Sequence, residues 1–120
     1  MRTILVTAIA LAFAGCSNGV SNSFLGGPLV EPGKAVGTLT VTNGSGVSLT
    51  AITISKCNAM SHGLNRMKSG ERVASGASRT FQLSDGCWDV MAGYNTYSGS
   101  ATGKRRITMA GGAPINITFQ

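Results

Sequence analysis

Few side chains in this chain could carry acid–base, nucleophilic or metal chemistry, and their spacing argues against each. His62 is the single histidine, whereas a zinc site needs three or four ligands of the Cys, His or carboxylate type. Ser61 lies next to His62, but adjacent residues rarely align a hydroxyl with an imidazole, and no acid is placed to orient the ring. Asp85 and Asp89 flank Cys87, and Asp85-Gly86 predicts a hairpin turn between two strands. We expect a turn-capping Asp85 and a surface Asp89 rather than a catalytic acid pair. We therefore expect a protein that is not an enzyme, with no catalytic residue, no metal site and no cofactor.

The first sixteen residues are typical of an export signal. Met1-Arg2 gives a short positive start, and residues 4–13 form an almost unbroken apolar stretch. At about ten residues, this stretch is roughly half as long as a helix that crosses a bilayer. A charged start, a short apolar core and small residues at the end characterise a secretory signal peptide, which we assign to residues 1–15.

The end of this signal, Phe13-Ala14-Gly15-Cys16, resembles the lipobox of bacterial lipoproteins, with Phe13 where Leu is usual. The resemblance implies that Cys16 is lipidated and becomes the new N-terminus, anchored in a membrane by several acyl chains. Ser17, where an Asp often marks retention in the inner membrane, points to the outer membrane, facing the periplasm or the surface. Ordinary secretion after Ala14 is the alternative, and it would leave Cys16 as an exposed odd thiol.

The two remaining cysteines, Cys57 and Cys87, predict a disulfide, because exported proteins normally pair their cysteines. We expect this bond to join the end of one strand to the start of the strand that carries Trp88. Residues 16–35 are rich in Ser, Asn, Gly and Pro, and they predict a flexible, solvated tether. Residues 36–120 then form one domain.

Period-two alternation of apolar and polar residues recurs through this domain, and helical periodicity is nearly absent. The alternating apolar positions are Leu39 and Val41; Val47, Leu49 and Ala51; Ile52 and Ile54; Phe81 and Leu83; Trp88, Val90 and Ala92; Ile107 and Met109; and Ile115, Ile117 and Phe119. The change of phase at Ala51-Ile52 predicts a β-bulge within one strand. The pattern predicts an all-β fold, a small disulfide-stapled β-sandwich of about seven strands that is immunoglobulin- or transthyretin-like.

The protein is basic, with a formal net charge of +6. A basic exported domain favours anionic neighbours such as phospholipid head groups, lipopolysaccharide phosphates or an acidic envelope protein. We expect no nucleic-acid partner, because the chain is exported and its aromatic residues do not interleave with basic ones. Lys104, Arg105 and Arg106 form the densest basic run, which either contacts an anionic partner or guards a strand edge against aggregation.

Residues 58–70 are the least sheet-like part of the domain. This stretch contains the candidate binding residues Asn58, His62, Asn65, Arg66 and Lys68. Long irregular segments on a rigid sheet scaffold often hold binding sites. The alternative is a connector whose polar groups satisfy its own backbone, and the sequence leaves both open.

Two stretches, LTVTNGSGVSLTAITIS and ASGASRTFQLSDGCWDV, together with the loop between them, are similar to a family of small exported bacterial β-domains of unassigned function. His62-Gly63-Leu64-Asn65 stands where that family commonly has Trp-Gly-x-Asn, and Trp88-Asp89-Val90 stands where it has Tyr-Asp-Leu. The resemblance implies export and a sandwich fold, and it supplies no catalytic residue.

These features predict a membrane-tethered envelope lipoprotein that acts as a non-catalytic binding or assembly module. The domain would engage its partner through loops or through strand addition at a sheet edge. A structural surface lipoprotein and a loop-based inhibitor of an exported enzyme are the alternatives.

Overall fold

The computed structural model describes residues 27–95 and 100–120. They form six strands: β1 Val36–Asn43, β2 Ala51–Lys56, β3 Ser78–Ser84, β4 Gly86–Asn95, β5 Ser100–Met109 and β6 Ile115–Phe119. The described residues contain no helix. The predicted signal peptide, the predicted lipidation site Cys16 and the predicted tether up to residue 26 lie outside the described residues.

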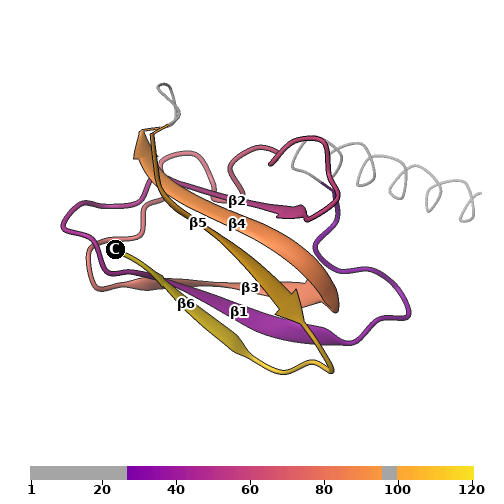
Figure 1. The fold of residues 1–120 in the computed structure, drawn as a ribbon. Helices are drawn as coiled ribbons and strands as arrows, with labels where there is room; N and C mark the ends of the chain where they lie inside the picture. Colours follow the sequence, from indigo (N-terminus) through magenta and orange to yellow (C-terminus); the bar gives the residue numbers. More distant parts are fainter. Residues whose placement is uncertain (1–26, 96–99) are drawn as a thin grey trace, which may run out of the picture.

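The strands make two three-stranded sheets with the orders β3-β1-β6 and β2-β4-β5 (Figure 1). All neighbouring strands are antiparallel except β1 and β6, which are parallel. The prediction of an all-β fold with a disulfide is confirmed. The number of strands is six rather than about seven.

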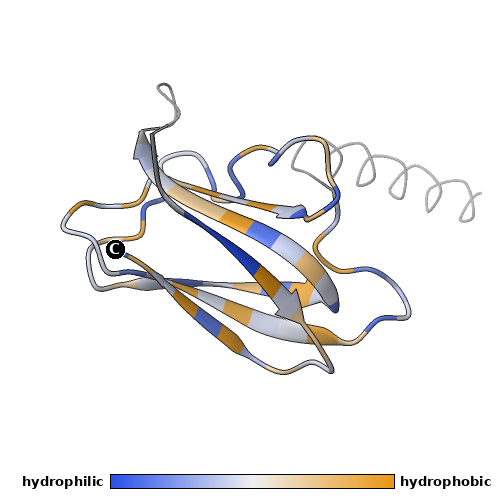
Figure 2. Ribbon diagram, in the orientation of Figure 1, coloured by the Kyte–Doolittle hydropathy of each residue, from blue (hydrophilic) through white to orange (hydrophobic). Residues whose placement is uncertain are grey.

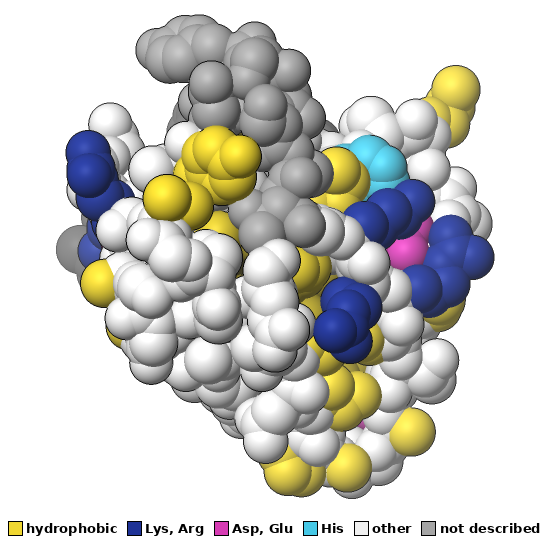
Figure 3. Space-filling view, turned by 60° about the vertical axis from the view of Figure 1, so that its left-hand side comes forward, with side chains coloured by type: hydrophobic (Ala, Val, Ile, Leu, Met, Phe, Trp, Pro, Cys, Tyr) yellow, Lys and Arg dark blue, Asp and Glu magenta, His cyan; other side chains and the backbone are white. Residues whose placement is uncertain are grey.

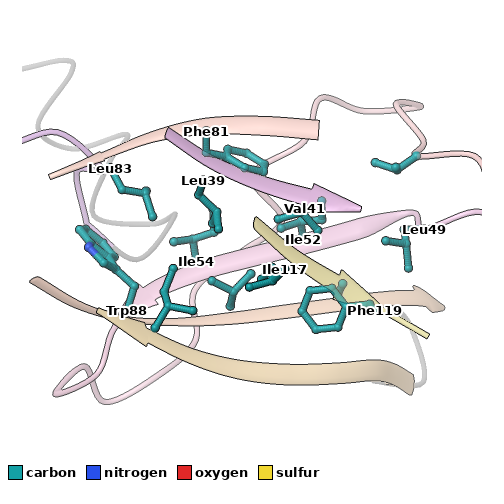
Figure 4. Close-up of a cluster of buried hydrophobic side chains, with 14 of the residues drawn as sticks. Leu39, Val41, Leu49, Ile52, Ile54, Phe81, Leu83, Trp88, Ile117 and Phe119 are labelled. Atoms are coloured by element: carbon teal, nitrogen blue, oxygen red, sulfur yellow. The ribbon is translucent and has the colours of Figure 1, made fainter. Parts of the chain in front are cut away.

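The two sheets enclose one apolar core. Buried residues alternate with partly buried ones along β1 and with exposed ones along β6, and the hydropathy colours alternate accordingly (Figure 2). Leu39 and Val41 of one sheet meet Ile52 and Ile54 of the other, and all four are fully buried (Figure 4). Trp88 is also buried, and its indole N–H donates to the carbonyl of Ser84 at 2.9 Å. The one polar group of the ring is therefore hydrogen-bonded within the core.

The predicted continuous strand with a bulge at Ala51-Ile52 is wrong. Leu49 forms an isolated bridge with Val73, and the N–H of Thr50 then donates to Gly93 at 2.9 Å, so the chain changes partners before β2 begins. Leu49, Ile52 and Ile54 are nevertheless all buried, because the change of partners shifts the inward face by one residue.

The predicted hairpin turn at Asp85-Gly86 is not a hairpin. Asp85 separates β3 from β4, but these strands belong to different sheets, so the segment is a crossing between layers and not a hairpin. Its carboxylate accepts hydrogen bonds from the N–H groups of Gly111 and Gly112, at 2.9 and 3.4 Å. Asp85 therefore caps the β5–β6 turn rather than its own.

The end of the predicted tether differs from a solvated chain, since residues 27–35 lie against the domain. Leu29 packs on the core, and its carbonyl accepts the N–H of Ser84 at 2.9 Å. Glu31 forms ion pairs with Lys34 and Lys56, and its own N–H donates to the hydroxyl of Ser84. Buried apolar area and ion pairs thus fix a segment whose composition resembles a linker.

Candidate functional site

The candidate loop is fixed at its start by the predicted disulfide, which is confirmed. Cys57 and Cys87 are bonded, with their Cα atoms 5.5 Å apart, and the N–H of Cys57 donates to the carbonyl of Cys87 at 3.2 Å. The bond joins the end of β2 to the start of β4, as the sequence predicts.

Asn65 is hydrogen-bonded to the outer edge of β2. Its Oδ1 accepts from the N–H groups of Ile52 and Met67, at 2.9 and 3.1 Å, and its Nδ2 donates to the carbonyl of Thr50 at 2.9 Å. The backbone N–H of Arg66 donates to the carbonyl of Ile52 at 2.7 Å. The loop thus satisfies edge groups that a further strand would otherwise pair.

Arg66 extends this cover along the same edge. Its Nε and Nη2 both donate to the carbonyl of Ile54, at 3.2 and 2.6 Å, and Nη2 also donates to the carbonyl of Gly27 at 2.9 Å. Burial lowers the pKa of this guanidinium from its ordinary value. Asn65 and Arg66 therefore hold the loop and residue 27 against β2.

Asp89 corrects the expectation of a surface carboxylate, because only 4% of it is exposed. It lies on β4 opposite Arg106 of β5, whose Nε and Nη2 donate to its two carboxylate oxygens at 2.9 and 3.1 Å. This bidentate pair lowers the pKa of Asp89, and the charges of Lys104 and His62 act in the same direction. The ion pair between Asp89 and Arg106 follows from the strand register, because pairing Trp88 with Ile107 places the next residues, Asp89 and Arg106, opposite each other.

His62 lies on the same face as this acid. Figure 3 shows the histidine beside a carboxylate that cationic side chains bracket. Both oxygens of Asp89 are bonded to Arg106, and no hydrogen bond joins this acid to His62 among the described residues. The Nδ1 atom of His62 is buried without a hydrogen-bond partner among the described residues.

The basic run does not form a single patch, because neighbouring residues of a strand face opposite sides. Arg106 pairs with Asp89, while Arg105 reaches across to β6 and donates to the carbonyl of Thr118 at 3.2 Å. Lys104 is exposed on the same face as Arg106. The two other candidates, Asn58 and Lys68, are exposed as well. The predicted binding residues are thus split between fold contacts and exposed positions.

The edge of β5 differs from the edge of β2. The Cys57–Cys87 hydrogen bond shows that Cys87 and Asp89 direct their backbone groups to β2, so the alternate residues Trp88 and Val90 direct theirs to β5. On β5, Ile107 and Arg105 pair with Trp88 and Val90, so their backbone N–H and C=O groups are directed toward β4. The backbone groups of Lys104, Arg106 and Thr108 are then directed away from β4, toward the open edge of the sheet. No other described segment forms backbone hydrogen bonds with these outward groups. Sequence reasoning missed Thr108, since only the register identifies it as an edge residue.

In residues 27–95 and 100–120, no three His, Cys, Asp or Glu side chains are grouped so that they could hold a metal ion. Over the same residues, no helix has the length and apolarity to span a membrane.

Comparisons with known protein families, curated proteins and solved structures found no match for this chain. The resemblance to the family of small exported bacterial domains therefore stays a prediction.

Proposed function

We propose that this protein is an exported, lipid-anchored and non-catalytic binding module that takes up an extended segment of an acidic envelope protein at the edge of β5. The observation that supports this most is the contrast between two edges. The β2 edge is occupied by Asn65 and Arg66, whereas β5 directs the backbone groups of Lys104, Arg106 and Thr108 outward. Strand addition requires an edge of this kind and no special side-chain motif.

The charge of β5 selects the type of partner. Residues 104–106 are three consecutive cations, and within the part of the chain that the structure describes only Arg106 is paired with a carboxylate. Two copies of this chain joined edge to edge would bring these cations together, and like charges opposite each other across a ladder are destabilising. An acidic strand gains from the same charges, so they both disfavour self-association and favour an anionic partner.

The anchor and location rest on the sequence. Lipidation of Cys16 would hold the domain at a membrane, with Ser17 favouring the outer one. The two-sheet arrangement is compatible with an immunoglobulin- or transthyretin-like sandwich, a scaffold that leaves edges and loops available for binding. The role of a loop-based inhibitor has less support, because Asn65 and Arg66 are engaged within the fold.

Thr108→Pro tests the strand-addition surface. Proline removes the outward N–H at this edge position without taking a hydrogen bond from the β4–β5 ladder. Thr108→Val is the matched control, because it keeps the N–H and removes only the hydroxyl. We expect cross-linking in cells to recover one protein in stoichiometric amount with the wild type and with Thr108→Val, and much less with Thr108→Pro.

Equal recovery with Thr108→Pro and wild type would refute strand addition at β5. Thermal unfolding of both variants controls for a folding defect. The anchor is tested separately by incorporation of labelled palmitate, which Cys16→Ser should abolish. Label that persists in Cys16→Ser, or is absent from the wild type, would refute lipidation at this residue.

A further inference from the structure

The loop between the disulfide and Asn65 exposes hydrophobic side chains to an unusual degree. Met60 is 105% exposed and Leu64 is 58% exposed, the two largest values among the exposed large hydrophobic residues of the described chain. Figure 3 shows hydrophobic side chains projecting beside the histidine of this face. Single exposed apolar residues are common, whereas Met60 and Leu64 lie four positions apart in one short loop, so a partner could cover both side chains at once.

The fold holds these side chains outward. Cys57 is fixed by the disulfide at one end of the loop, and Asn65 is fixed by three hydrogen bonds at the other. Gly63 between them has a φ of 76°, a turn conformation that other residues rarely adopt. Because both ends of the loop are fixed, burying Met60 and Leu64 in a partner costs less chain entropy than it would in a free segment.

The start of the described chain lies beside this loop. Arg66 holds the carbonyl of Gly27 at 2.9 Å, and Glu31 is paired with Lys56, the residue that precedes Cys57. Only the ten residues Ser17–Gly26 then separate Gly27 from Cys16. A chain of that length spans about 40 Å at most. The contact with Arg66 therefore places the point where the chain departs toward the proposed anchor beside this loop.

The charges around the loop suit an anionic surface. Lys104 and Arg106 lie on the face that His62 shares with Asp89, and this acid is buried and paired. Arg106 and Asp89 offset each other's charge, and Lys104 is paired with no carboxylate among the described residues, so this face carries net positive charge. Anionic head groups attract basic residues close to a membrane surface.

We propose that Asn58–Leu64 is a membrane-contact loop, in which Met60 and Leu64 enter the interface of an anionic lipid bilayer beside the anchor. This inference builds on the lipid anchor of the proposed function, and the cations near the loop contact the head groups. An interfacial contact of this type orients the domain, so that binding surfaces on β5 keep a constant relation to the membrane.

The test uses the mature chain from residue 16 to residue 120 with Cys16→Ser, so that binding does not depend on acylation. Cosedimentation is measured with vesicles of phosphatidylethanolamine and phosphatidylglycerol, and with neutral vesicles of phosphatidylcholine. We expect stronger binding to the anionic vesicles, weakened by salt. Met60→Ser combined with Leu64→Ser should lower the partition coefficient by about tenfold or more. Val47→Ser is the control, since Val47 is 48% exposed but precedes β2, at the opposite end of that strand from the loop.

Background binding by the parent chain, or equal binding by the double variant and the parent, would overturn the proposal. A loop that contacts a protein instead of lipid also gives background binding and overturns it. Thermal unfolding of the double variant should match that of the parent, because both side chains are exposed. Failure here leaves the Thr108→Pro and palmitate experiments unaffected, so the two proposals fail separately.

Discussion

Replacing Asn65 by alanine tests whether this candidate residue serves the fold or a partner. The substitution removes three hydrogen bonds, two of which satisfy Thr50 and Ile52 on the edge of β2. A hydrogen bond contributes a net free energy of about 0.5–1.5 kcal/mol, and a buried group left unpaired costs more. Asn65 is only half-buried, so water replaces part of what is lost. We expect the free energy of unfolding to fall by about 2 kcal/mol.

For a domain of this size, each kcal/mol lowers Tm by about 4–8 °C, so Asn65→Ala should melt about 8–16 °C below the wild type. The assay is thermal and urea unfolding of the mature chain, followed by circular dichroism with the disulfide intact. Asn58→Ala is the matched control, because Asn58 is an exposed asparagine of the same loop, and its effect should stay within about 0.5 kcal/mol.

Asn65→Asp separates the two sides of the amide. It keeps the acceptor for the N–H of Ile52 but places an oxygen where Nδ2 donates to the carbonyl of Thr50, so it should also destabilise the domain. If Asn65→Ala unfolded at the wild-type temperature and denaturant concentration, the assignment of Asn65 to the β2 edge would be refuted.

Two further predictions concern packing and charge. In Gly37→Ala, the added Cβ would lie 2.7 Å from the carbonyl oxygen of Ala113 and 2.8 Å from Cε of Met109. We expect urea unfolding to show a loss of about 1–3 kcal/mol, against less than about 0.5 kcal/mol for the control Gly46→Ala, where nothing lies within 4 Å; near-equal values would contradict the packing argument. Because Arg106 lowers the pKa of Asp89, the stabilisation by this carboxylate is fully present above its ordinary pKa of 3.8 and is lost as pH falls through the lower folded value. Unfolding measured between about pH 7 and pH 2 should therefore show a smaller acid loss in Asp89→Asn than in the wild type, and parallel curves would disprove the assignment.

The alternating runs predicted most of the strands and most of the core, because an inward-facing residue must be apolar whichever strand lies beside it. The same local signal does not say which strands are neighbours. Asp85-Gly86 reads as a hairpin turn, yet it joins strands of different sheets, and Leu49 and Ile52 are inward-facing on either side of a change of partner. Strand pairing depends on contacts between residues far apart in the chain, which a turn signal does not contain.

In the candidate site, the sequence likewise shows which residues are polar but not which groups they contact. Asn65, Arg66 and Lys68 are polar residues of one loop and look equivalent in the sequence, but two of them cover the edge of β2 and the third is exposed. The sequence predicts a surface acid at Asp89, because its ion-pair partner Arg106 lies on the next strand and local sequence does not show that pairing. Charge and polarity are visible in a sequence, whereas their partners are not.

The sequence by itself determined the all-β class, the pairing of Cys57 with Cys87 and the basic character, because composition, period and cysteine count act locally or over the whole chain. It also predicts an export signal in residues 1–15, which a localisation experiment in cells would test. Tertiary structure alone decided which edge is covered, which acid is buried and that residues 27–35 pack on the domain. Each of these depends on free energy gained when distant residues exclude water together, and no single stretch of the chain contains that information.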